Sequence, residues 1–398
     1  MGAGRRQRLH RLIAVVNAEK GESLKILVTG GAGFIGSHIV DALIAAGHEV
    51  RVLDALVAQV HGSRDSESTR PPYLHTDAEL VQGDICDAAL IEQALEGVEA
   101  VFHQAAEVGV GQSMYEITRY VDANTRGTAI LLQALIRRRR HIRKLVVASS
   151  MSIYGEGACE CRQCGPVAPP LRSAEQLGAH EWEVRCPGCG REVRPSPTRE
   201  TKPLFPGSVY AITKQDQEQL SLVLGRAYGI PTIALRYWNV YGARQALSNP
   251  YTGVCAIFSA RLLNGQPPLI FEDGCQLRDF VHIRDIVQAN LLALESPDAN
   301  YHAINIGSGE VINIRQVAQM LAEGLGRSIA PIFPGKSREG DIRRCIPDLT
   351  RARSVLGYKP QVTLAQGIPE LLDWVRSQTA RDSVETATAE LAARQLVR

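Results

Sequence analysis

The glycine-rich segment TGGAGFIG constrains this chain more than any other feature, because it joins a strand-like run to a helix-like run. Residues 25–29 read KILVT, and apolar side chains recur at helical spacing over residues 34–46. Three positions between these runs are glycine for different reasons: one allows a tight turn, one allows the backbone to approach a ligand closely, and one allows the helix to pack closely. A Cβ atom would be in the way at each. The helix that follows offers free backbone amides to phosphate groups. We therefore predict a dinucleotide site that contains Gly30, Gly33, Phe34, Ile35 and Gly36.

An acidic residue after the next predicted strand indicates which dinucleotide is bound. Asp54 ends the segment HEVRVLD, 18 residues after Gly36. A carboxylate at this place can accept hydrogen bonds from the adenosine ribose hydroxyls, and it would repel a 2′-phosphate. We therefore expect NAD rather than NADP as the cofactor.

The alternation of strands and helices indicates the fold class. Strands alternating with helices imply right-handed crossovers and a parallel sheet covered on both faces. The pattern predicts further strands at 79–82, 100–103, 144–149 and 231–236, and helices at 88–95, 120–137, 208–228, 254–263 and 314–325. We expect an α/β fold with a doubly wound parallel sheet (a Rossmann domain, residues 25–236), a smaller substrate lobe interleaved with the last core strands (237–376) and a tail (377–398).

The stretch 155–206 interrupts this rhythm and carries a cysteine pattern. It has no long helical or strand period and contains two CxxCG motifs separated by 21 residues. This spacing predicts a closed, structural Cys₄ zinc ribbon inserted into the core domain. A separate hypothesis is that the ribbon forms part of the wall or the lid of a pocket. A reactive thiol cluster and a ribbon without metal are the alternatives, and Cys159 is a further possible ligand. The predicted zinc ligands are Cys161, Cys164, Cys186 and Cys189.

The overall charge argues against two classes of partner. Lys and Arg number 44 against 42 Asp and Glu, so the net charge of +2 creates no field that would attract nucleic acid or a membrane surface. The nine cysteines fit a reducing compartment, which favours the cytoplasm. We interpret residues 1–24 as a basic leader or an extra helix ahead of the fold, because the apolar patch at 12–16 is too short for a signal peptide.

Tyr210 and Lys214 form a YxxxK motif at the start of a predicted helix. A spacing of four places the phenol and the ammonium on one face of the helix. We expect the cation to lower the pKa of the phenol, so that Tyr210 becomes a base for a sugar hydroxyl, while Lys214 also holds the nicotinamide ribose. A surface pair without function is the alternative, and the glycine segment upstream argues against it.

The spacing GlyxxGlyxxGly, together with QGDI, VFHQAA and the YxxxK motif, resembles the extended short-chain dehydrogenase/reductase family. The likeness extends from Lys25 to about Trp374 without the insertion. It implies that Ser150 in ASSMSIYG is the third catalytic residue and shares a proton with Tyr210, whereas Ser149 and Ser152 could cap the strand end. It further implies cofactor contacts from Asp84, Ile85, Ala105, Ala106 and Asn124, and a substrate contact from Ser152.

The residues after Ser150 narrow the reaction that this resemblance implies. Sugar 4,6-dehydratases of the family carry an Asp-Glu pair directly after the catalytic Thr, and this chain has Met151 and Ser152 there. The expected activity is thus a nucleotide-sugar 4-epimerase that works through a transient 4-keto sugar. The alternatives are a dehydratase or reductase of the same family and a nucleotide-sensing regulator without catalysis.

The C-terminal half matches the substrate-binding segments of nucleotide-sugar epimerases. Arginine suits a diphosphate because its planar fork pairs two phosphate oxygens at once. For Arg278 the alternative is a salt bridge to Asp279 or Asp285. The likeness, closest to a subgroup that includes dTDP-L-rhamnose 4-epimerases, implies a dTDP- or UDP-sugar substrate and a homodimer built from the Tyr120 and Ser208 helices. The implied substrate contacts are Asn239, Val254 (in NPYTGVCAIF), Arg278, Arg338 and Asp341.

Overall fold

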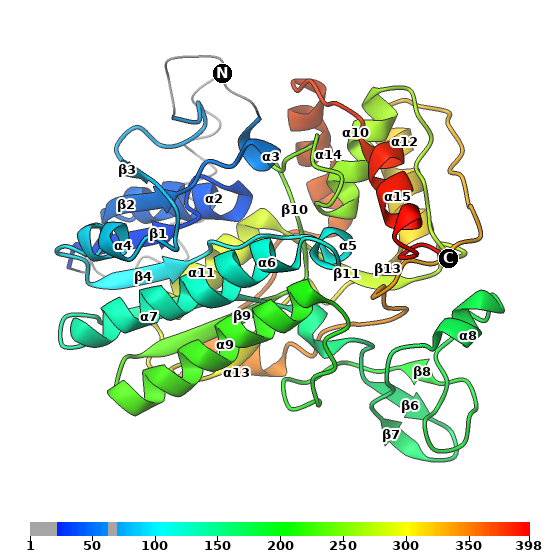
Figure 1. Ribbon diagram of the computed structural model, residues 1–398, viewed down its shortest axis with the longest axis horizontal. Coiled ribbons are helices and arrows are strands. Elements are labelled where there is room, and N and C mark those ends of the chain that lie inside the picture. The colour runs from blue at the N-terminus through cyan, green and yellow to red at the C-terminus, as the bar shows by residue number, and fades with distance from the viewer. Residues whose placement is uncertain (1–21, 63–69) are drawn as a thin grey trace.

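A seven-stranded parallel sheet forms the centre of the protein (Figure 1). The computed structural model describes residues 22–62 and 70–398, so nearly all of the predicted leader lies outside the described residues. Neighbouring strands pair in parallel throughout the sheet, which confirms the predicted doubly wound fold. Its order across the sheet is β12 (Ala303–Ile306), β9 (Thr232–Tyr237), β5 (Lys144–Ser150), β4 (Ala100–His103), β1 (Lys25–Thr29), β2 (Glu49–Asp54) and β3 (Glu79–Gln82).

Helices cover both faces of this sheet, and each face has its own apolar core. One face carries α2 (Phe34–Ala45), α11 (Ile283–Glu295) and α13 (Thr350–Leu356); the other carries α4 (Ala88–Ala94), α7 (Gly127–Arg137) and α9 (Val209–Tyr228). Ser208 caps α9 by accepting a hydrogen bond from the Ala211 amide at 3.1 Å, and Gly229 ends it in a left-handed conformation. The Ser208 cap fixes the start of α9, two residues before Tyr210 of the YxxxK motif.

The predicted helix over 120–137 is not continuous. It consists of α6 (Ile117–Tyr120), a π-helical turn η1 (Val121–Arg126) and α7. Such a turn inserts one residue into the helical repeat and is frequent at functional sites. Here it contains the fully buried Asn124. Three short helical segments complete this domain: α3 (Ala58–His61), α5 (Val110–Ser113) and the 3₁₀ turn η2 (Met151–Tyr154).

A second lobe with its own core lies beside the carboxyl ends of the central strands (Figure 1). It contains a small sheet of β10 (Asn239–Tyr241), β11 (Leu277–His282) and β13 (Val311–Asn313), and the helices α10 (Val254–Leu263), α12 (Ile314–Gly324), α14 (Leu364–Arg376) and α15 (Val384–Ala393). The insertion forms a separate sheet of β6 (Cys159–Cys161), β7 (Gly165–Val167) and β8 (Arg194–Pro195), and α8 (Ala174–Gly178) lies between β7 and β8 in the chain.

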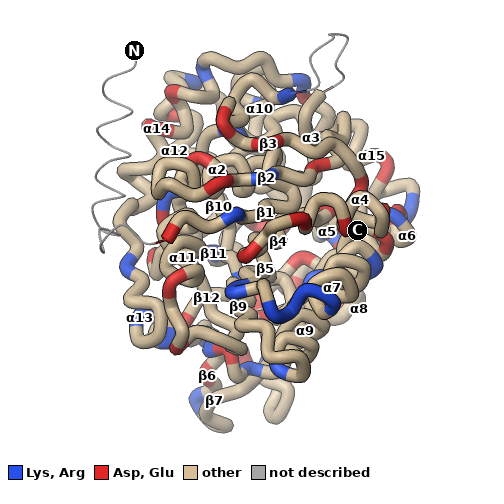
Figure 2. The backbone as a smooth tube through the Cα atoms, turned by 90° about the vertical axis from the view of Figure 1, so that its left-hand side faces the viewer, with Lys and Arg blue, Asp and Glu red and all other residues tan. Residues whose placement is uncertain are grey.

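Acidic and basic residues are interspersed along the chain, as Figure 2 shows. The clearest basic run, Arg137 to Arg140, lies at the end of α7, and Glu92 pairs with its first two members. Within residues 22–62 and 70–398, no helix combines the length and the apolar character needed to cross a bilayer.

Candidate active site

The glycine turn between β1 and α2 leaves no room for side chains. A Cβ atom on Gly30, whose φ is +66°, would lie 2.7 Å from the Ala105 nitrogen, and one on Gly36 would lie 2.2 Å from the Gly30 oxygen. Gly33 caps α2 without a side chain, so no side-chain cap competes for the amides of its first turn, which includes Phe34 and Ile35. Backbone amides that lack a side-chain acceptor at a helix N-terminus suit a pyrophosphate. The turn therefore fits the phosphates of a dinucleotide.

Asp54 lies at the end of β2, where the sequence predicts contact with the adenosine ribose. Its carboxylate accepts hydrogen bonds from the backbone amides of Ala32 and Leu56, each at 2.9 Å, and His61 Nε2 lies 3.5 Å away. Each oxygen keeps a lone pair beyond its backbone bond. The two amides fix the carboxylate beside the glycine turn, and its contact with the adenosine ribose stays a prediction.

Ser150 and Tyr210 meet at the carboxyl end of β5. The Ser150 hydroxyl is hydrogen-bonded to the Tyr210 phenol, and it accepts hydrogen bonds from the Ser152 hydroxyl at 2.9 Å and the Ser152 amide at 3.2 Å. Ser149 instead donates to Glu218 at 2.7 Å inside the core, which removes it from the site. The structure thus brings the predicted serine and tyrosine together, with Ser152 as their neighbour.

Lys214, one helical turn after Tyr210 on α9, is buried and bonds to partners that the sequence does not reveal. Its ammonium donates to the Ala148 carbonyl at 2.7 Å and to Gln217 Oε1 at 2.8 Å. Gln217 in turn donates to His103 Nε2 at 3.1 Å and to Thr128 Oγ1 at 3.0 Å. All of these side chains are inaccessible to solvent or nearly so. Gln217 therefore links the lysine of the YxxxK motif to the end of β4.

The expected effect of Lys214 on Tyr210 is not seen in this arrangement. Burial raises the pKa of Tyr210, and its hydrogen bond with Ser150 is what lowers it. Burial also lowers the pKa of Lys214 to about 7. Neither of these contributions to the pKa of Tyr210 comes from Lys214, whose ammonium is bonded to Ala148 and Gln217, so the predicted effect of the ammonium on the phenol stays a prediction. In this structure Ser150 is the group that favours the tyrosinate.

Asn124 shapes the backbone next to the predicted cofactor site. Its side chain accepts from the Glu107 amide at 2.7 Å and donates to the Glu107 carbonyl at 3.0 Å and to Thr213 Oγ1 at 2.9 Å. It thereby ties the segment after Ala105 and Ala106 to α9. A direct contact between Asn124 and the cofactor stays a prediction.

The predicted adenine-contacting pair follows β3. Asp84 is exposed and accepts from the Cys86 amide at 2.8 Å, whereas Ile85 is buried against α7, where a Cβ atom on Gly127 would lie 2.5 Å from it. Ile85 therefore packs in the core at the sheet edge, and the adenine contact of both residues is untested.

The predicted diphosphate residues gather on β10, β11 and the segment 338–344. Asn239 donates to the Asp279 carbonyl at 2.9 Å, and Arg278 donates to the Ile342 carbonyl at 2.6 Å. Asp279 accepts from the amides of Ser308 and Gly309, and Asp285 from those of 361 and 362. A salt bridge from Arg278 to either acid is therefore not formed, and its guanidinium lies against backbone carbonyls.

Arg338 and Asp341 form an ion pair with 2.9 Å between Arg338 Nε and Asp341 Oδ2. The Arg338 guanidinium also lies 4.7 Å from the centre of the Phe271 ring. Gly340, between them, approaches Gly207 so closely that a Cβ atom would lie 2.8 Å from the Gly207 oxygen. This loop consequently reaches the start of α9, three residues before Tyr210.

Val254, the remaining predicted substrate contact, is the first residue of α10 and is partly buried.

Sequence reasoning missed the part that the predicted tail has in this region. The amides of Ser337 and Glu339 donate to the carbonyls of Arg398 and Leu396, at 2.8 and 2.9 Å. On the other side, Glu390 of α15 accepts from Tyr115 at 2.9 Å and from Tyr251 at 3.2 Å. Residues 384–398 thus contact both the core domain and the loop that carries Arg338.

The four predicted zinc ligands come together. Their sulfur atoms all lie within 4.8 Å of one another, and Cys159 is not among them. A tetrahedral site with Zn–S bonds of about 2.3 Å has sulfur atoms about 3.8 Å apart, which this cluster can provide. Backbone amides of Cys164 and Gln163 lower the pKa of Cys161 to about 6, whereas hydrogen bonds with Cys189 and Cys186 raise the pKa of Cys164 to about 12. The residues therefore fit a zinc ion.

Known proteins share both the sequence and the fold of this chain. A sequence profile of the NAD dependent epimerase/dehydratase family matches residues 26–174 and 187–307. The dTDP-L-rhamnose 4-epimerase of Burkholderia thailandensis is 36% identical over 368 residues, which span 92% of this chain and 99% of that protein. The UDP-glucose 4-epimerase of Thermotoga maritima, solved with UDP-glucose, is 33% identical with a TM-score of 0.71 and covers 89% of this chain and 99% of its own.

A third similar protein was solved with its cofactor. The UDP-glucuronic acid 4-epimerase of Bacillus cereus, in complex with UDP-glucuronic acid and NAD, is 28% identical with a TM-score of 0.72, and the match covers 89% of this chain and 99% of that one. The resemblance stated from the motifs is thereby confirmed. Since the profile spans more than half of the chain and the glycine turn has the geometry that the cofactor needs, this chain belongs to the NAD dependent epimerase/dehydratase family.

Proposed function

We propose that this protein is an NAD-dependent nucleotide-sugar 4-epimerase that acts on a dTDP- or UDP-linked hexose. The observation that carries the proposal is the Ser150–Tyr210 hydrogen bond at the end of β5, together with the buried Lys214 and the glycine turn at the end of β1 in the same sheet. A base, a hydroxyl partner and a cofactor site in this arrangement suit reversible oxidation of a sugar hydroxyl. The similarity to the Burkholderia enzyme makes a dTDP-6-deoxyhexose such as dTDP-L-rhamnose the first substrate to test.

The chain's own residues supply proton transfer and binding. Tyr210 takes the proton from the sugar O4, and Ser150 holds that oxygen and stabilises the tyrosinate. NAD, which the glycine turn and Asp54 would hold, would supply reversible hydride transfer at the sugar C4. Tyr210 then gives its proton back to O4, so no net oxidation occurs. The guanidinium groups of Arg278 and Arg338 hold the diphosphate during both half-reactions.

Two features favour epimerisation over dehydration. Elimination of water from C5 and C6 needs an acid and a base next to the catalytic serine, and Met151 and Ser152 occupy those positions. Met151 is buried and cannot transfer protons, while the Ser152 hydroxyl is bonded to Ser150. A regulator without catalysis would have no use for the Ser150–Tyr210 contact.

The proposal also covers the metal, the oligomer and the compartment. Cys161, Cys164, Cys186 and Cys189 hold a structural zinc ion, which leaves no open coordination position. A homodimer forms through α6, η1 and α9, because large apolar side chains are exposed along these helices. None of the nine cysteines forms a disulfide, which supports a reducing, cytoplasmic location. The exposed apolar side chains on the helices of the proposed dimer interface are Ile117, Val121, Ile212 and Val223.

Incubation of the purified enzyme with a panel of dTDP-, UDP- and GDP-sugars, followed by NMR, tests the activity. We expect a mixture of C4 epimers from at least one dTDP- or UDP-sugar without added NAD. Tyr210→Phe should abolish the conversion while retaining bound NAD. A 4-keto-6-deoxy product, or an unchanged rate in Tyr210→Phe, would contradict the proposal.

A further inference from the structure

The backbone of residues 341–344 is held from two sides. From β11, Arg278 donates to the Ile342 carbonyl, and the Leu277 amide donates to the Arg343 carbonyl at 3.0 Å. From the insertion, the buried Glu156 accepts from the amides of 343 and 344 at 2.8 and 3.0 Å. The Gly157 amide donates to the Arg344 carbonyl at 2.7 Å. The segment next to Asp341 is thus clamped between the substrate lobe and the insertion.

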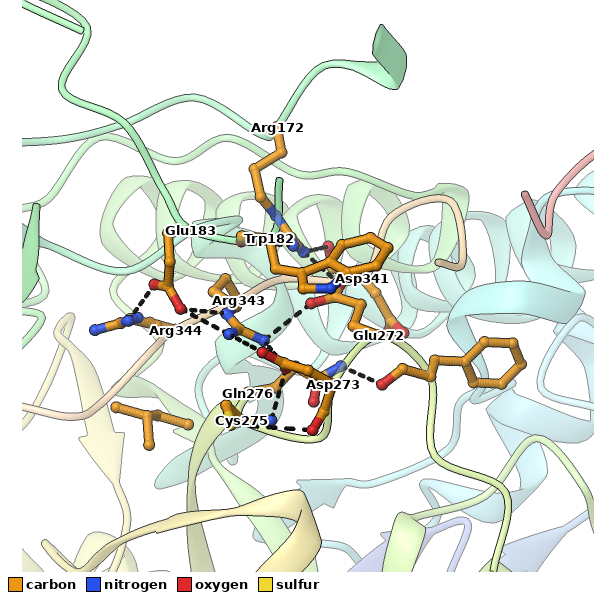
Figure 3. Close-up of polar contacts among 12 residues, drawn as sticks. Arg172, Trp182, Glu183, Glu272, Asp273, Cys275, Gln276, Asp341, Arg343 and Arg344 are labelled. Carbon is orange, nitrogen blue, oxygen red and sulfur yellow. Dashed lines mark hydrogen bonds and ion pairs between the residues drawn. The ribbon is translucent and has the colours of Figure 1, made fainter. Parts of the chain in front are cut away.

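Charged side chains extend this clamp, as Figure 3 shows. Arg172 of the insertion donates to Glu272 at 2.8 Å and to the Asp341 carbonyl at 3.1 Å, and it pairs with Glu156 at 3.3 Å. Arg172 and Glu272 have side-chain exposures of 2% and 1%. This ion pair is therefore shielded from solvent. Removal of either partner would leave a buried charge without a counter-charge and would destabilise the segment.

Glu183 forms the second bridge between the insertion and this segment. It accepts from Arg343 Nη2 at 2.6 Å and Nε at 3.2 Å, and it also pairs with Arg344. Arg343 has a side-chain exposure of 1% and is shared with Asp273, 2.6 Å away. Figure 3 shows the carboxylate of Glu183 directed at both guanidinium groups.

The position of Glu183 depends on the cysteine cluster. It lies three residues before Cys186, and the neighbouring Val184 packs with Cys161, Cys186 and Val193 in the core of the insertion. The backbone at Trp182 is fixed by Arg172, which donates to its carbonyl at 3.0 Å. A rigid ribbon therefore places Glu183 and Arg172 together against residues 341–344.

We infer that the insertion positions the nucleotide-binding loop of this enzyme, with Glu183 and Arg172 as positioning residues for Arg278, Arg338 and Asp341. The inference rests on the proposed function, because it assigns the substrate diphosphate to that loop. In this role the insertion does not line the substrate pocket. It holds the loop that carries the binding residues in place through ion pairs with Arg343 and Glu272. The loop then binds substrate tightly only while the ribbon is folded.

Glu183→Gln tests the inference, because it keeps the side-chain shape and removes the charge that Arg343 and Arg344 share. Glu181→Gln is the matched control, since Glu181 pairs with Arg185 on the surface, where both side chains are about half exposed. Calorimetric titration of the holoenzyme with UDP and with dTDP measures nucleotide affinity. We expect Glu183→Gln to bind about tenfold more weakly, which corresponds to about 1.4 kcal/mol. Glu181→Gln should match the parent.

Two further readouts separate positioning from a general loss of structure. Glu183→Gln should raise KM for the nucleotide-sugar about tenfold while kcat stays within about twofold of the parent. Bound NAD, measured after denaturation, should be unchanged. Removal of the metal from the parent with a chelator should weaken UDP and dTDP binding in the same way and leave NAD in place.

The possible outcomes distinguish the inference from the proposed function. If the parent binds UDP or dTDP and Glu183→Gln binds equally well, the positioning inference is wrong and the proposed function stands. If kcat and bound NAD fall together with affinity, the insertion has only a structural role and the inference is again wrong. A parent that binds neither nucleotide contradicts the proposed function itself.

Discussion

Replacing Gln217 by methionine should change the pH at which Lys214 loses its proton. The amide oxygen of Gln217 is one of two acceptors for the ammonium, and its nitrogen donates to His103 and Thr128 in a region without solvent. Methionine has nearly the same length and cannot accept this hydrogen bond well. The substitution therefore removes one stabilising contact from a buried cation without opening a large cavity.

The size of the effect follows from that contact. A hydrogen bond to a charged group contributes about 1.5–3 kcal/mol, which corresponds to about one to two pKa units. Burial already lowers the pKa of Lys214 to about 7. Loss of the acceptor disfavours the charged form and lowers the pKa further, so the lysine is mostly neutral at pH 7. If catalysis needs the ammonium, activity should fall on the basic side at a pH about one to two units lower.

The pH dependence of kcat, followed by NMR on the active nucleotide-sugar, measures this shift. Gln217→Glu is the informative partner, because a carboxylate beside Lys214 favours the cation and should move the same limb to higher pH. Thermal unfolding and bound NAD should be measured for both variants to exclude misfolding. Identical pH profiles for the parent and both variants, or shifts in the same direction, would refute the assigned role of Gln217.

Three further predictions concern the remaining parts of the site. Ser150→Ala should raise the pKa of Tyr210 and move the acid limb of kcat to higher pH, since the serine hydrogen bond lowers that pKa; an unmoved acid limb would contradict this. Elemental analysis should find about one zinc ion per chain, lost in Cys186→Ser and kept in Cys159→Ser, whereas loss in both or neither would argue against the Cys₄ site. Ile212→Asp combined with Val223→Asp should give a monomer in light scattering with NAD still bound, and a persisting dimer would place the interface elsewhere.

The sequence predicts those parts of the site that depend on local order. The turn at Gly30, the adjoining helix and Asp54 lie within 30 consecutive residues, so strand, turn and helix signals determine one another. The helix at 254–263 likewise has the predicted bounds. The two CxxCG motifs also meet as expected, because their spacing suits one tetrahedral ligand set.

Other features depend on contacts between distant residues and could not be predicted. The π-helical turn at 121–126 could not be predicted from the apolar pattern, because one additional residue in a turn barely changes the periodicity over six positions. Lys214 bonds to Ala148, 66 residues away, so its partners depend on how α9 packs on β5. Glu156 bonds to the Arg343 amide 187 residues away, and nothing local in either segment indicates that pairing.

The hydrogen bonds between residues 337–339 and 396–398 have a consequence for the timing of ligand exchange. The amides of Ser337 and Glu339 flank Arg338 and are closed by the last residues of the chain. A movement of the Arg338 loop away from residues 396–398 breaks these two bonds. The rate of deuterium uptake at the Ser337 and Glu339 amides therefore reports how often the loop opens. We expect bound nucleotide to lower the exchange rate of these two amides and to leave the exchange rates of the amides inside β1 unchanged.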